Sequence, residues 1–111
     1  MKTNSKAVLL FAAVLVSVVK LSADAQQSWD DQCASCHASN GNGKTKEGIK
    51  LHVKDYTDPK VQADFTDAGL LKNLMLGVGT ESNPNRMPCY KAKLTAAEAK
   101  ELIALIRSFK K

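Results

Sequence analysis

Apolar and polar positions divide the chain into a short uncharged stretch near the start and a remainder with helical periodicity. Residues 7–19 read AVLLFAAVLVSVV, and Lys2 and Lys6 precede them. Near the other end, Thr95 and Glu98 have the spacing of a capping box, and an apolar face at helical spacing follows them. This face consists of Ala99, Leu102, Ile103, Ile106 and Phe109. The pattern predicts a C-terminal helix that packs by one side.

A first helix is expected near Ser28, because Ser28 and Asp31 have capping-box spacing. It would run into Cys33 and Cys36 and end at the Asn-Gly-Asn-Gly run of residues 40–43. Residues 44–57 are rich in lysine and show neither helical nor strand alternation, so they are interpreted as a loop.

The middle of the chain carries two more helix-start signals. Asp58 followed by Pro59 is typical of an N-cap with proline at the first helical position. Thr66 precedes an apolar stripe that runs from Leu70 to Val78. Gly77 and Gly79 are expected to end this helix, and residues 80–90 then form a loop. No segment alternates as a strand would. The sequence predicts an all-α domain of three to four helices joined by long loops.

The uncharged stretch is interpreted as part of a signal peptide covering residues 1–25. It has a basic start, a short apolar core and an Ala-x-Ala site at residues 23–25. The alternative is a membrane anchor, but a spanning helix needs about 20 apolar residues and Lys20 ends this run earlier. The sequence predicts cleavage after Ala25, no stable membrane insertion afterwards, and a periplasmic or otherwise exported domain at residues 26–111.

The charge and composition of that domain exclude one class of function and indicate a stabilising group. Of the 16 basic and 11 acidic residues, three and one precede the cleavage site, which leaves a net charge of +3. Without an arginine-rich stripe, this charge does not indicate nucleic acid binding. A domain of 86 residues with few aromatic side chains has a marginal core, so a disulfide, metal or cofactor is expected to stabilise it.

Residues 33–37 read Cys-Ala-Ser-Cys-His, the C-x-x-C-H attachment signature of c-type haem. Two cysteines at this spacing lie on one side of a helical turn, where Cys33 and Cys36 can each form a thioether with a haem vinyl group. His37 would then ligate the iron. The prediction is one covalent haem c per chain.

Two alternatives to haem remain open at this point. A redox dithiol is one, although such motifs normally follow a strand and open a helix. The other is a structural zinc held by Cys33, Cys36, Cys89 and either His37 or His52, although the second pair lacks the tight spacing of a zinc knuckle.

A closed electron carrier needs a second axial ligand, and four residues are candidates. Met75 belongs to an apolar helical stripe, and His52 lies in the lysine-rich segment. Met87 lies between two helices and is followed by Pro88, which would hold its thioether in place. Met87 is therefore preferred over Met75, His52 and Cys89.

With these residues in place, the chain resembles the small monohaem class I cytochromes c of bacteria. The resemblance rests on Trp29 four residues before Cys33, on residues 33–37, on the loop segments 43–46 and 51–58, and on the run from Met87 into the last helix. It implies the class I cytochrome c fold, with the first and last helices crossing beside the haem. It also implies single-electron transfer between protein partners.

The sequence departs from that family at three points. One is Leu105, where the last helix of relatives often carries an aromatic residue, and the other two lie near His37. Ala38 stands where a glycine often follows the haem histidine. Relatives often carry a proline soon after the motif whose carbonyl accepts a hydrogen bond from the histidine, but none occurs here before Pro59. The partner of the second nitrogen of His37 is therefore unassigned.

Cys89 has no partner if the other cysteines carry haem. The simpler interpretation is a small buried residue. The alternatives are a reactive thiol that links two chains of an otherwise monomeric protein, and a thiolate ligand in place of Met87.

The function predicted from the sequence is soluble one-electron transfer rather than enzyme catalysis. Lysines could steer the protein onto acidic redox partners. They are Lys44, Lys46, Lys50, Lys54, Lys72, Lys91 and Lys93. The alternatives are a haem-containing subunit of a larger respiratory oxidoreductase and a haem sensor with an open sixth position.

Overall fold

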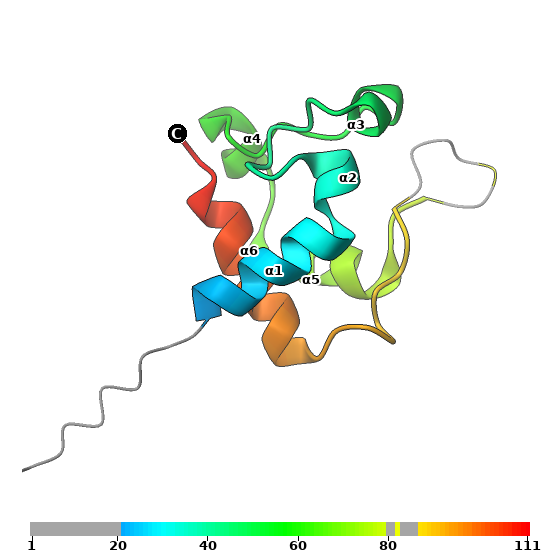
Figure 1. Ribbon diagram of the computed structural model, residues 1–111, viewed down its shortest axis with the longest axis vertical. Coiled ribbons are helices and arrows are strands. Elements are labelled where there is room, and N and C mark those ends of the chain that lie inside the picture. The colour runs from blue at the N-terminus through cyan, green and yellow to red at the C-terminus, as the bar shows by residue number, and fades with distance from the viewer. Residues whose placement is uncertain (1–20, 80–81, 83–86) are drawn as a thin grey trace, which may run out of the picture.

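Helices account for most of the regular structure in the computed structural model, which describes residues 21–79, 82 and 87–111. These parts of the chain contain six helices (Figure 1). They are α1 (Leu21–Gln32), α2 (Ala34–His37), α3 (Lys46–Lys50), α4 (Pro59–Asp64), α5 (Asp67–Leu76) and α6 (Ala96–Ser108). The predicted all-α fold is confirmed, with short helices α2 and α3 added to the predicted set. The apolar stretch of residues 7–19 lies outside the described residues.

The core forms where α1 and α6 cross, with α5 packed against α6 (Figure 1). Trp29 from α1 and Leu102 from α6 are each 2% exposed. The predicted capping box of α6 is present, because Thr95 Oγ1 accepts from the amide of Glu98 and Glu98 Oε1 accepts from the amide of Thr95. The predicted apolar face of α6 is buried, with Phe109 half-buried just beyond the helix end.

The predicted start of the first helix is wrong. α1 begins at Leu21, so Ser28 lies inside the helix and is not its N-cap residue. The helix also ends earlier than expected, at Gln32, and α2 begins after a one-residue break at Cys33. Hydrogen bonds between side chains four residues apart stabilise α1 on its exposed side. Gln26 pairs with Asp30, and Gln27 pairs with Asp31.

The lysine-rich segment is not entirely a loop, because it contains the single turn α3. Thr45 caps this turn by accepting from the amide of Gly48 at 2.8 Å. Gly48 is buried, and a Cβ there would collide with the carbonyl oxygen of Cys36. Thr45 Oγ1 also donates to that carbonyl at 2.8 Å. Close backbone approach therefore fixes α3 against the C-x-x-C-H segment.

The other helix-start predictions are confirmed. Asp58 caps α4 by accepting from the amide of Lys60, with Pro59 at the first helical position. Thr66 caps α5 by accepting from the amide of Gly69, and Gly77 is the C-cap residue that follows Leu76.

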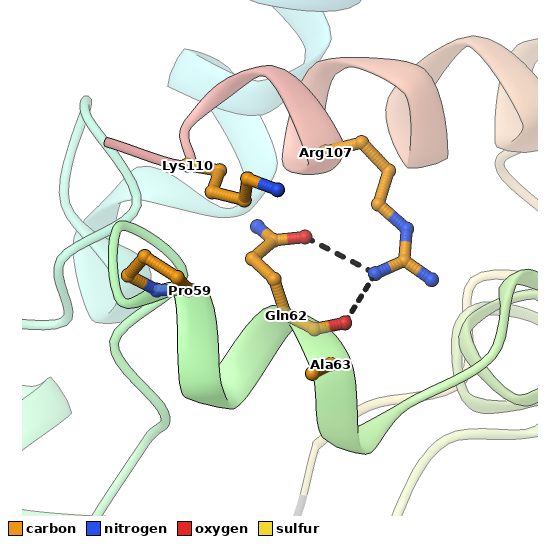
Figure 2. A pocket seen from close by; sticks show the side chains of 5 residues that line it. All are labelled: Pro59, Gln62, Ala63, Arg107 and Lys110. Carbon is orange, nitrogen blue, oxygen red and sulfur yellow. Dashed lines mark hydrogen bonds between the residues drawn. The ribbon is translucent and has the colours of Figure 1, made fainter.

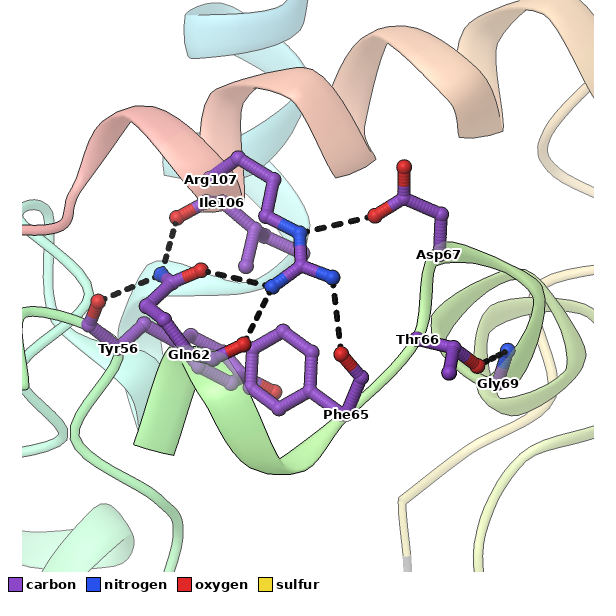
Figure 3. A network of polar contacts seen from close by, with 8 residues as sticks. All are labelled: Tyr56, Gln62, Phe65, Thr66, Asp67, Gly69, Ile106 and Arg107. Carbon is purple, nitrogen blue, oxygen red and sulfur yellow. Dashed lines mark hydrogen bonds and ion pairs between the residues drawn. The ribbon is translucent and has the colours of Figure 1, made fainter. Parts of the chain in front are cut away.

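Arg107 joins α4, α5 and α6 (Figure 3). Its Nη1 donates to the carbonyl of Gln62 at 2.6 Å, and its Nη2 donates to the carbonyl of Phe65 at 2.9 Å. Gln62 is 5% exposed and returns a bond through its Nε2 to the carbonyl of Ile106 at 2.8 Å. Of these residues, Arg107 and Gln62 line a cavity of about 310 Å³ (Figure 2). Because the guanidinium donates mainly to carbonyl oxygens of the chain itself, its role is structural.

Among the described residues, no helix is both long enough and apolar enough to span a membrane.

Candidate haem site

The C-x-x-C-H segment forms one backbone turn at the junction of α1 and α2. The amide of Cys33 donates to the carbonyl of Trp29 at 2.8 Å, which completes α1. The amide of His37 then donates to the carbonyl of Cys33 at 2.9 Å. The turn places both cysteines and His37 against one cavity. Each of the three cysteines is a free thiol.

That cavity has a volume of about 460 Å³ and is bounded by segments far apart in the sequence. The motif contributes Cys33, Cys36 and His37, and the segment after α5 contributes Met87 and Pro88. The remaining lining residues include Trp29, Leu51, His52, Val53, Lys54, Tyr56, Leu70, Leu74, Val78, Tyr90 and Ile106. The four residues predicted to bind the haem and its iron thus line the same cavity.

Backbone pairing holds Met87 at this cavity. Met87 and Val78 form an antiparallel bridge, and Gly77 before it has φ of 75°. A Cβ on Gly77 would lie 2.6 Å from the carbonyl oxygen of Met87, which is too close for any other residue. Beyond Met87, the amide of Tyr90 donates to the carbonyl of Leu74 at 3.0 Å. The parts of the predicted loop at residues 80–81 and 83–86 lie outside the described residues.

The other candidate ligands lie in different environments. Met75 packs against the hydrophobic core and is not among the residues that line the cavity. His52 is exposed at the cavity, with φ of 55°. Cys89 is exposed, and its Sγ donates to the carbonyl of Met75 at 2.7 Å. The expectation that Cys89 is buried is wrong, because its side chain is exposed after the bridge between Val78 and Met87. Among the described residues, no three His, Cys, Asp or Glu side chains gather as a metal site would require.

Aromatic rings enclose the imidazole of His37. The Tyr56 ring stacks on it with centroids 5.4 Å apart and planes 17° apart, and the Trp29 ring lies 5.5 Å away at 42°. The Nδ1 atom is buried, and no described residue hydrogen-bonds it. Burial lowers the pKa of His37, so the imidazole is neutral at neutral pH and keeps a lone pair for a metal.

Burial also raises the pKa of the Cys33 thiol to about 11, with a smaller contribution from Cys36 nearby. The thiol is therefore protonated at neutral pH and is a poor nucleophile by itself.

The backbone after His37 is strained. Ala38 has φ of 66° and ψ of 159°, a region that is almost restricted to glycine. Its carbonyl accepts from Trp29 Nε1 at 2.9 Å and from the amide of Gly41 at 3.1 Å. These two bonds hold the turn that presents His37, and the positive φ of Ala38 explains why a glycine suits this position.

The cavity fits a haem group. Two free thiols lie one turn apart on its wall, a neutral imidazole follows them, and a thioether comes from a separate segment. The remaining wall is largely apolar and aromatic, as a porphyrin requires.

Comparison with known proteins agrees with this fit. The cytochrome c family model matches residues 22–110. Among solved structures, the KustC0563 c-type cytochrome is 30% identical with a TM-score of 0.67, and the match covers 78% of this chain and 98% of that one. A tyrosine-to-phenylalanine mutant of the same cytochrome gives 30% identity, a TM-score of 0.64, and coverage of 78% and 99%. None of the curated protein sequences compared with the chain matches it significantly.

The chain therefore belongs to the cytochrome c family. Its cofactor is covalently bound haem c, and its activity is haem-based electron transfer to and from redox partners. The resemblance to a small class I cytochrome c is confirmed.

Sequence reasoning missed three contributors to the site. The sequence indicates only a loop around Tyr56, because the stacking of its ring on His37 depends on contacts between distant segments. The pattern predicts only a helix end at Gly77, and it predicts only a place for Val78 in an apolar stripe. The glycines on both sides of Val78 were the available signal for an unusual backbone there.

Proposed function

We propose that the protein is an exported, soluble one-electron carrier, not an enzyme, with haem attached through Cys33 and Cys36 and ligated by His37 and Met87. The observation that carries this proposal is the position of Met87 in the same cavity as the C-x-x-C-H turn. A thioether held there favours a closed electron-transfer site over a haem sensor with an open sixth position.

Each residue has a separate task in this proposal. The bound haem supplies an iron that alternates between the ferric and ferrous states. The neutral imidazole of His37 and the soft, neutral thioether of Met87 together favour the ferrous form and so raise the reduction potential. The α1–α2 turn fixes His37, and the bridge to Val78 fixes Met87. Because both segments are fixed by backbone bonds, little structural rearrangement is expected between the two oxidation states.

The exposed lysines suit transient docking of an acidic partner. Lys54 lines the cavity, and all seven of the lysines expected to steer docking are exposed. The apolar side chains of Ile49, Leu76 and Val78 are exposed as well, at 66%, 62% and 40%. Positive charge raises the association rate with an acidic partner, and small apolar contacts allow rapid release. The rate of reduction by an acidic partner is expected to fall as ionic strength rises; a rate indifferent to salt would contradict this docking mode.

Export is supported by the sequence of residues 1–25 and is tested separately. Mass spectrometry of the exported protein is expected to give a chain that begins at Gln26. Cleavage after Ala25 would also shorten α1, which begins at Leu21. It would remove the first turn of this helix together with the buried side chain of Ala25, which is 4% exposed. A chain that retains Met1 would contradict cleavage.

Covalent attachment is tested by replacing the cysteines in a host that matures c-type cytochromes. Haem staining on a denaturing gel and the intact mass are expected to show one haem per native chain. Cys33→Ala and Cys36→Ala should each lose a thioether bond and most of the covalently bound haem. Cys89→Ala is the matched control, since Cys89 is exposed and is not among the cavity-lining residues. Equal haem content in all three variants would contradict the proposed attachment.

A further inference from the structure

We propose that Tyr56 is the positioning residue for His37. Its aromatic ring fixes the orientation of the imidazole, which at most metal-bound histidines is fixed by an acceptor that hydrogen-bonds the second ring nitrogen, here Nδ1. The inference rests on the proposed function, because it takes His37 as an axial ligand. It assigns a task to a residue whose backbone lies in the loop between α3 and α4.

The first argument is the condition of the imidazole itself. A metal-bound histidine almost always donates its second ring N–H to a carboxylate, carbonyl or water, which fixes the orientation of the ring. Here Nδ1 is buried, and no described residue accepts from it. The ring is instead covered by Tyr56, nearly parallel at 17°, and by Trp29, tilted at 42°. Packing therefore restricts rotation of the imidazole, where a hydrogen bond would otherwise do so.

The second argument is that Tyr56 is fixed from several sides. Its amide donates to the carbonyl of Gly41 at 2.8 Å, and its carbonyl accepts from Gln62 Nε2 at 2.7 Å. The edge of the Phe65 ring meets its ring at 86°, with centroids 5.6 Å apart. The guanidinium of Arg107 lies 4.6 Å from the centroid of Phe65 (Figure 3). A rigid group can orient a neighbour, and Tyr56 meets that condition.

This arrangement has a consequence for the reduction potential. A hydrogen bond from Nδ1 makes an imidazole a stronger electron donor, which stabilises the ferric form. Packing that buries Nδ1 and provides no acceptor leaves the imidazole a weaker donor. Tyr56 is therefore expected to hold the reduction potential higher than it would be if water reached Nδ1.

The test compares the haem-loaded native protein with Tyr56→Phe and Tyr56→Leu. Phenylalanine keeps the stacked ring and removes only the hydroxyl, so it is the matched control. Leucine removes the ring and opens a path for water to Nδ1. The readouts are the reduction potential and the solvent exchange of the His37 Nδ1 proton, followed by NMR in the ferrous state.

The expected result is that native protein and Tyr56→Phe share nearly the same potential and a slowly exchanging Nδ1 proton. Tyr56→Leu should have a lower potential and exchange that is faster by at least about tenfold, because local opening exposes the proton. Equal shifts in both variants would assign the effect to the hydroxyl and overturn the proposal. So would the absence of any difference between Tyr56→Leu and native protein.

Tyr56→Leu could fail to fold. A second test therefore uses the native protein alone. A native Nδ1 proton that shows coupling to an acceptor carbonyl, or rapid exchange with solvent, would overturn the role of the ring. Native protein without a low-spin haem would instead refute the proposed function itself. The two failures are thus separated by the spectrum of the native protein before any variant is made.

Discussion

Val78 and Met87 face each other as an antiparallel backbone pair. The amide of Val78 donates to the carbonyl of Met87 at 3.0 Å, and the amide of Met87 donates to the carbonyl of Val78 at 2.8 Å. Both residues line the cavity that also contains the C-x-x-C-H turn. The position of the proposed methionine ligand is therefore set by two backbone bonds, and does not depend on the apolar core alone.

Replacing Gly77 tests that pairing. Gly77→Ala would strain a backbone with positive φ and push a Cβ against the carbonyl of Met87. A strain of about 1–3 kcal/mol, relieved by releasing Met87, corresponds to about 5-fold to 150-fold in an equilibrium constant. Added imidazole should therefore bind the ferric variant about tenfold more tightly than native protein, as measured by optical titration.

Gly69→Ala is the matched control on the same helix. A Cβ at Gly69 would meet only Thr66 Oγ1, at 3.1 Å. Its imidazole affinity should equal that of native protein. If both variants behave alike, the bridge does not hold the ligand.

Ala38 offers a gain in stability. Its backbone, at φ of 66° and ψ of 159°, costs an L-residue about 1–3 kcal/mol, whereas glycine loses about 0.5–1 kcal/mol through greater freedom of the unfolded chain. Ala38→Gly should therefore raise the free energy of unfolding by about 1 kcal/mol, measured by guanidinium denaturation of the haem-loaded protein. The control is Ala104→Gly on the exposed side of α6, which should lower it by about 1 kcal/mol. A less stable Ala38→Gly variant would contradict the strain argument.

Arg107 supports the fold through its bonds to carbonyl oxygens. Its ion pair with Asp67, at 2.8 Å, is largely exposed and contributes little. The bonds to the carbonyls of Gln62 and Phe65 are more enclosed, and lysine cannot reproduce the planar fork that makes both. Arg107→Lys should lower the free energy of unfolding by about 1–3 kcal/mol, and Lys100→Ala, an exposed position on α6, by less than about 0.5 kcal/mol. Equal stability of the two variants would show that the carbonyl contacts are dispensable.

The capping box of α6 predicts a pH dependence. Hydrogen bonds from Thr95 lower the pKa of Glu98 in the folded protein. A lowered folded-state pKa means that the stabilisation is present above the unfolded-state pKa and is lost as pH falls through the folded-state value. Native protein should therefore be more stable than Glu98→Gln at neutral pH, and the difference should shrink under acidic conditions. A difference independent of pH would contradict this assignment.

Local signals in the sequence were enough for most helix starts. Thr66, Asp58 and the Thr95–Glu98 pair each satisfy orphan amides within a few residues, so their effect can be predicted without knowledge of the fold. The capping-box spacing of Ser28 and Asp31 predicted a wrong helix start, because both residues lie inside a helix that begins at Leu21.

The candidate site was predictable where it depends on a motif and unpredictable where it depends on packing. Residues 33–37 and Met87 were identified from spacing and from the proline that follows. The stacking of Tyr56 on His37 and the bridge between Val78 and Met87 join segments whose approach is set by the whole fold. The same reason explains the error at Cys89, whose exposure depends on the direction of the chain after the bridge.

The most direct test of ligation by His37 and Met87 is the optical spectrum of the haem-loaded protein in both oxidation states. We predict sharp low-spin bands in the reduced protein and the weak far-red band of methionine-bound ferric haem in the oxidised protein. Met87→Ala should lose the far-red band, while Met75→Ala, outside the cavity lining, should keep it. High-spin native protein, or a far-red band that survives in Met87→Ala, would contradict the account.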